Sequence, residues 1–209
     1  MTPFYRAPLA LFLLAAAMLP LPAYPYLVTI TAGTKSIFLQ VGTGTMTGGT
    51  FNAGGTPGNN GTINTVTVTV PAASLGAGTQ AMTTNSTVTA SPWDGYAFCP
   101  SVPSQVYIGG FYRTPGTGTN ATLPATSPAS LVSGGDSISF STISWVSGGN
   151  GDATATIPSG TFVAGTAQTL LSIARNSWFE SCMQFNYAKA TVVPAGTFNG
   201  RVTYPLTSP

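Results

Sequence analysis

The chain has 209 residues, of which only 5% are charged, and its formal net charge at pH 7 is +2. Such a small charge excludes a basic nucleic-acid-binding surface, and the lack of histidine excludes a Ser-His-Asp or Cys-His active site. Because 43% of the residues are hydrophobic, the composition also excludes a disordered chain of low hydrophobicity and high net charge. We therefore expect a folded protein without catalytic residues, cofactor or metal, whose polar surface comes mainly from threonine, serine, asparagine and glycine.

The first 23 residues have the three-part layout of a secretory signal peptide. Arg6 supplies a positive charge, residues 7–19 are almost wholly apolar, and a proline-containing stretch ends at Ala23. The apolar run of about 13 residues is shorter than the ~20 needed to span a bilayer, so a permanent membrane anchor is the weaker alternative. We predict cleavage after Ala23 and export of one domain over residues 24–209 to the periplasm and then the cell surface.

The first predicted strands of the exported part are residues 27–31 and 36–41, followed by a loop rich in glycine, threonine and asparagine over 42–61. Residues 63–70 alternate strictly between apolar and polar side chains. The inward sets predicted for the second and third strands are Ile37, Leu39 and Val41, and Val66, Val68 and Val70. Two further segments carry weaker signals, one helical turn within 72–78 and a short strand at 87–90.

The middle of the chain combines one strong strand with one apparent loop. Residues 105–112 have strand composition, and the Gly109-Gly110 pair inside them predicts a bulge or a bend. Residues 114–130 are rich in proline, threonine and glycine and are predicted to be a long loop.

The remaining third alternates again, with Ile138, Phe140, Ile143 and Trp145 predicted to be buried on either side of a break in register within 137–146. Further predicted strands are 153–157, 168–175, 183–187, 191–193 and 197–206. Short alternating segments separated by glycine and proline turns predict an all-β fold, an antiparallel immunoglobulin-like β-sandwich that is either complete or lacks one strand.

The two cysteines, Cys99 and Cys182, form an isolated pair in a chain predicted to be exported. In an oxidising compartment such a pair is more often bridged than free, so we predict a disulfide bond. Two buried free thiols are the alternative.

The four carboxylates lie far apart in the sequence, which disfavours a paired-carboxylate active site. Asp94, Asp136 and Asp152 lie beside glycine or serine and are expected to cap turns. Glu180 is expected to pair with Arg175.

Residues 93–98 form an aromatic cluster next to Cys99. Trp93 and Tyr96 could form an exposed platform for surface glycans. Packing of these rings around the predicted disulfide is the alternative that we favour, because large aromatic side chains are mostly buried.

The C-terminus has a further pattern, in which Phe198, Gly200, Val202, Tyr204 and Leu206 alternate on one face. Gly196 is the fourteenth residue from the end. With these positions, the stretch GTFNGRVTYPLT over 196–207 resembles the closing motif of chaperone–usher fimbrial subunits, in particular the spore-coat-U-like branch.

The resemblance implies a structural subunit of a surface fibre, built on an incomplete sandwich whose groove is filled by a strand from a neighbouring pilin subunit. It implies a periplasmic chaperone and an outer-membrane usher as partners. The donor strand would be residues 24–31, and the final strand would form one wall of the groove. The expected pocket-filling residues are Tyr26, Val28 and Ile30, and the expected groove residues are Phe198, Val202, Tyr204 and Leu206.

Two alternatives stay open. Residues 24–31 could be the ordinary first strand of a complete sandwich. The protein could also be a secreted carbohydrate-binding module or a tip adhesin that uses Trp93 and Tyr96. In addition, Pro205 lacks a backbone donor, which predicts that the outer edge of the last strand cannot pair continuously.

Overall fold

The fold is an antiparallel all-β sandwich, as predicted. The computed structural model describes residues 30–44, 64–76, 78–92, 95, 97–99, 104–149 and 157–208. Its strands are β1 (Ser36–Val41), β2 (Val66–Thr67), β3 (Thr79–Ala81), β4 (Thr83–Thr84), β5 (Gln105–Arg113), β6 (Ala121–Thr126), β7 (Ser130–Ser133), β8 (Asp136–Ser139), β9 (Ile143–Gly148), β10 (Gly160–Thr161), β11 (Ala167–Ile173) and β12 (Ser177–Ala188). Within this part of the chain, no helix is long and apolar enough to cross a membrane.

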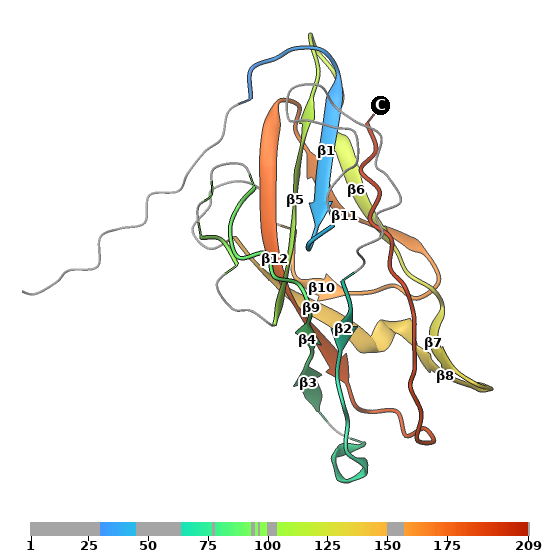
Figure 1. Cartoon of the computed structure of the whole chain (residues 1–209). Coiled ribbons are helices and arrows are strands. Elements are labelled where there is room, and N and C mark those ends of the chain that lie inside the picture. Colours follow the sequence, from blue (N-terminus) through green and yellow to red (C-terminus); the bar gives the residue numbers. More distant parts are fainter. Residues whose placement is uncertain are drawn as a thin grey trace, which may run out of the picture.

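The main sheet has the strand order β1-β5-β12-β9-β10, and β3 also pairs with β12 (Figure 1). Its longest strands, β5 and β12, lie next to each other. The register of β5 is continuous against both β1 and β12, so of the bulge or bend predicted at Gly109-Gly110 the bulge is wrong. These glycines instead permit close approach, because a Cβ on Gly109 would collide with the Tyr107 hydroxyl and one on Gly110 with the Phe38 carbonyl oxygen.

The second sheet is built on the antiparallel pair β6 and β11. Strand β6 lies inside residues 114–130, so the loop predicted there is wrong in its second half. The small and apolar residues Ala121, Leu123 and Ala125 are fully buried, and they alternate with Thr122, Pro124 and Thr126. The proline concealed this strand in the sequence.

Several short elements differ from the predictions. The turn expected within 72–78 is a 3-10 turn at Ala72–Ser74, and neither 87–90 nor 191–193 is a regular strand. A second 3-10 turn, Phe140–Thr142, separates β8 from β9 and is the predicted break in register. Strands β3, β4, β7 and β10 were not predicted, because each has only two to four residues and too few alternations to be recognised.

The core between the sheets contains side chains from both, and the predicted inward sets face it. Leu39 is buried, while Ile37 and Val41 pack against the core from the same strand. The four residues predicted around the register break are also buried, each at most 5% exposed: Ile138, Phe140, Ile143 and Trp145. The alternating valines of 63–70 are half-buried and pack against the same core, whereas the intervening threonines are exposed.

Candidate functional site

The C-terminal segment runs antiparallel to β6 and is held by separate pairs of backbone hydrogen bonds. The Thr207 N–H donates to the Thr122 carbonyl oxygen at 2.9 Å, and the Thr122 N–H donates to the Thr207 carbonyl oxygen at 2.8 Å. Thr203 and Thr126 exchange the same two bonds, at 3.0 Å from the Thr203 N–H and 2.9 Å from the Thr126 N–H. Nearer the start of the segment, Asn199 pairs with Val132 of β7 in the same way. The strand predicted over 197–206 is therefore not a regular strand but an extended segment joined to β6 and β7 by isolated antiparallel bridges, and we call this segment the C-terminal strand.

The interruption is caused by two prolines. The bridges Thr122–Thr207 and Thr126–Thr203 define the register, which places Pro124 opposite Pro205 midway between them. In an antiparallel ladder every second residue pair exchanges two hydrogen bonds, so Pro124 and Pro205 occupy the position of such a pair. Neither proline has an N–H, so neither bond can form. The donor that Pro205 lacks therefore faces β6, so the predicted interruption of the outer edge is wrong.

The outer edge of the C-terminal strand carries the backbone groups of Val202, Tyr204 and Leu206. The backbone N–H and C=O groups of the neighbouring Thr203 and Thr207 point towards β6. Since successive residues of a strand direct these groups to opposite sides, those of Val202, Tyr204 and Leu206 point away from β6. Among the residues that the structure describes, none of the three makes a backbone–backbone hydrogen bond. None is proline, so this side of the strand offers a full set of donors and acceptors.

The side chains of the same strand face the core. Leu206 is 5% exposed, and Phe198, Val202 and Tyr204 are half-buried against the core. Burial raises the pKa of the Tyr204 phenol above its ordinary value. The strand also approaches its support closely at Gly200, where a Cβ would lie 2.8 Å from Leu131 and 2.9 Å from Phe140 side-chain carbons. The predicted groove residues thus form one half-buried apolar row.

Residues 64–70 form a second edge with the same pattern. Thr65 accepts a hydrogen bond from the Asn85 N–H, and Val66 and Thr67 pair with β4, so the odd-numbered residues point their backbone groups towards that strand. The backbone groups of Val66, Val68 and Val70 therefore point away from it, while the side chains of these valines pack against the core. Two apolar edge segments thus lie on the same core.

The structure describes only the last two residues of the predicted donor strand over 24–31. Ile30 is 8% exposed and packs with Phe38, Phe111 and Trp178 of its own domain. Its N–H donates to the Asn176 carbonyl oxygen at 3.2 Å. Tyr26 and Val28, the other two predicted pocket-filling residues, lie outside the described residues.

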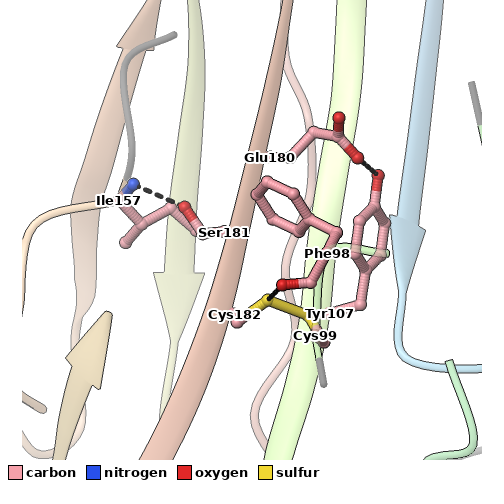
Figure 2. The surroundings of a disulfide bond; sticks show 7 residues. All are labelled: Phe98, Cys99, Tyr107, Ile157, Glu180, Ser181 and Cys182. Atoms are coloured by element: carbon pink, nitrogen blue, oxygen red, sulfur yellow. Dashed lines mark hydrogen bonds between the residues drawn. A yellow bond between two sulfur atoms is a disulfide. The ribbon is translucent and has the colours of Figure 1, made fainter. Parts of the chain in front are cut away.

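The predicted disulfide bond between Cys99 and Cys182 is confirmed, with the Cα atoms 5.6 Å apart. Both cysteines are at most 1% exposed and lie in a small cluster with Phe98 and Tyr107, whose rings meet edge to face (Figure 2). The Cys182 sulfur lies 3.2 Å from the Phe98 carbonyl oxygen. The bond joins residues 83 positions apart, for which chain entropy gives a stabilisation of about 4.5 kcal/mol.

A buried carboxylate lies beside this disulfide. Glu180 is 4% exposed and accepts a hydrogen bond from the Tyr107 hydroxyl at 2.7 Å (Figure 2). Arg175, the partner expected from the sequence, is exposed in the turn before β12. Gly109 pairs with Glu180 across the strands and leaves room for the Tyr107 hydroxyl. The sequence does not reveal this role of Tyr107, because the hydrogen bond joins residues 73 positions apart.

Trp93 and Tyr96, the predicted glycan platform, lie outside the described residues, as do Asp94 and Asp152. Among the residues that are described, no group of three or more histidine, cysteine, aspartate or glutamate side chains could hold a metal ion. Comparison of the chain with protein-family models, with curated proteins and with solved structures found no match.

Proposed function

We propose that this protein is a structural subunit of a bacterial surface fibre, in which the N-terminal segment of one copy adds as a strand to the open edge of the next. The observation that carries the proposal is the C-terminal strand. Its outward backbone groups at Val202, Tyr204 and Leu206 have no backbone partner in the described part of the chain, while its side chains form a half-buried apolar row.

This combination suits strand addition. An added strand gains affinity from main-chain hydrogen bonds and gains register from alternate side chains that enter apolar pockets. The C-terminal edge supplies the hydrogen-bonding groups, and the half-buried side chains of Val202 and Tyr204 supply apolar surface. The matched prolines leave this function intact, because their missing donors face inwards.

The segment proposed to add is the start of the exported chain, with Tyr26 and Val28 as its pocket-filling side chains. It contains no charged residue between Tyr24 and Thr31, so its burial would leave no unpaired ion in the sandwich. An exposed strand edge is an aggregation hazard before assembly. The proposal therefore includes a periplasmic chaperone that covers the edge and an outer-membrane usher that orders the assembly.

The test is the thermal stability of the exported chain in the presence of a peptide with the sequence of residues 24–31. A ligand that binds only the folded state at about 100 times its Kd stabilises it by about 2.7 kcal/mol, which raises the Tm by roughly 5–10 °C. A peptide with Val28→Asp should have no effect, because it buries an unpaired charge.

The matched control is a peptide with Thr29→Asp, whose charge lies on the opposite face of the strand and should be tolerated. If the unmodified peptide leaves the Tm unchanged at saturating concentration, the proposal is wrong. Equal stabilisation by both aspartate peptides would exclude binding in the proposed register.

A further inference from the structure

We infer that Ile30 is an anchor that fixes the N-terminal arm to its own domain, so that the part of the arm available to another copy ends at Thr29. The addition of this arm to another copy rests on the proposed function, whereas the anchoring of Ile30 to its own domain does not. In this assignment Ile30 fills no pocket of the neighbouring subunit, which differs from the role expected from the sequence.

The anchor lies on the outer face of the main sheet. Phe38 pairs with Phe111 across β1 and β5, and Phe111 pairs with Trp178 across β5 and β12. The three ring centroids lie 6.0 to 6.2 Å apart. Ile30 is buried against this aromatic row, which lies on the opposite face of the sheet from the main core.

Backbone contacts hold the same segment at two points. At one point the Ile30 N–H donates to the Asn176 carbonyl oxygen at 3.2 Å. Asn176 is itself held, because its N–H donates to the Tyr112 carbonyl oxygen at 2.7 Å and its side chain accepts from the Thr114 N–H at 3.1 Å. At the other point the Arg113 Nε donates to the Thr34 carbonyl oxygen at 3.2 Å. The arm therefore cannot leave the sheet at residues 30–34 without breaking these contacts.

The remaining length of the arm fits the proposed acceptor edge. If cleavage follows Ala23, the segment from Tyr24 to Thr29 spans about 17 Å when extended. The edge from Val202 to Leu206 is about 13 Å long. A short arm of this length can pair along the whole edge while Ile30 stays on its own domain.

The experiment has two parts, one with variants of the chain and one with variants of the peptide. In the exported chain, Ile30→Ala should lower the Tm by about 4–10 °C, because it removes a buried side chain from the aromatic row. The exposed Thr31→Ala is the matched control and should change the Tm by less than about 2 °C. As a second measurement, a chain that starts at Ile30 should keep the Tm of the exported chain, whereas one that starts at Gly33 should lose the same 4–10 °C.

In the second part, the 24–31 peptide with Ile30→Asp should raise the Tm of the unmodified chain as much as the natural peptide does, whereas the Val28→Asp peptide should not. Loss of the effect with the Ile30→Asp peptide would overturn the assigned boundary, and an unchanged Tm for both Ile30→Ala and the chain starting at Gly33 would overturn the anchor. If no peptide acts but the chain variants lose stability, the anchor holds and the proposed fibre function fails.

Discussion

Pro124 of β6 and Pro205 of the C-terminal strand face each other across an antiparallel ladder, at the one pair between Thr122–Thr207 and Thr126–Thr203 where two hydrogen bonds would otherwise form. Both prolines therefore lose a donor at the same place. The inner side of the C-terminal strand is weakened, and its outer side keeps every donor. This asymmetry is what makes the strand a suitable acceptor edge in the proposed fibre.

Removing one outward donor should abolish strand addition. We predict that Tyr204→Pro eliminates the rise in Tm caused by the 24–31 peptide, because the Tyr204 N–H points away from β6, to the edge that has no backbone partner among the described residues. Tyr204→Ala is the matched control: it loses the same side chain but keeps the N–H, so part of the peptide effect should persist. An equal response of the two variants would show that this N–H is not used.

Removing one inward donor should instead destabilise the isolated chain. The Thr203 N–H donates to the Thr126 carbonyl oxygen at 3.0 Å. We predict that Thr203→Pro lowers the free energy of unfolding in urea by about 1–3 kcal/mol, since a paired acceptor loses its partner. Thr203→Ala keeps this bond, and its side chain is exposed, so it should cost less than about 0.5 kcal/mol.

Replacing both cysteines by serine should lower the free energy of unfolding by about 2–5 kcal/mol, because the disulfide closes a long loop and lies in a buried cluster. Denaturant unfolding of the variant and of the oxidised chain measures the difference. A loss below about 1 kcal/mol would mean that the cluster of Phe98 and Tyr107 holds this region without the covalent bond.

Gly109 should not tolerate a side chain. A Cβ there would collide with the Tyr107 hydroxyl and lie 3.0 Å from the Phe179 carbonyl oxygen, so Gly109→Ala should destabilise the chain by about 1–3 kcal/mol. Gly135→Ala is the control, because nothing lies within 4 Å of its added Cβ. Tyr107→Phe by itself should also destabilise the chain, because it removes the hydrogen bond to the buried Glu180 carboxylate. The double variant should therefore lose less stability than the sum of the two single variants, and a purely additive double variant would contradict the collision.

Tyr204 should make the stability of the chain depend on pH in the alkaline range. Burial raises the pKa of its phenol in the folded state, whereas the unfolded chain has the ordinary value near 10. The stabilisation is therefore complete below pH 10 and is lost as the pH rises above it, because the unfolded state releases the proton first. Tyr204→Phe should remove this part of the decline in unfolding free energy between pH 9.5 and 11.5. Tyr187, whose pKa is also raised by burial, should leave a residual decline in the unfolding free energy of that variant.

The sequence by itself determined which side chains face the core in the strands that alternate strictly, but not in β6, where Pro124 concealed the pattern. Strict alternation identified Val66, Val68 and Val70, and the register break near Phe140 was visible because the alternation changes phase there. The disulfide was predictable because the chain has only two cysteines. These features depend on local periodicity or on composition, which a single sequence carries in full.

Only the tertiary structure decided which edges are paired. Whether Pro205 interrupts the inner or the outer edge depends on which of its two sides faces β6, and whether Ile30 belongs to its own domain depends on the aromatic row formed by β1, β5 and β12. The hydrogen bond between Tyr107 and Glu180 likewise joins distant strands. A period of two residues fixes the faces of a strand, but its neighbours are chosen by long-range packing, which no local pattern encodes.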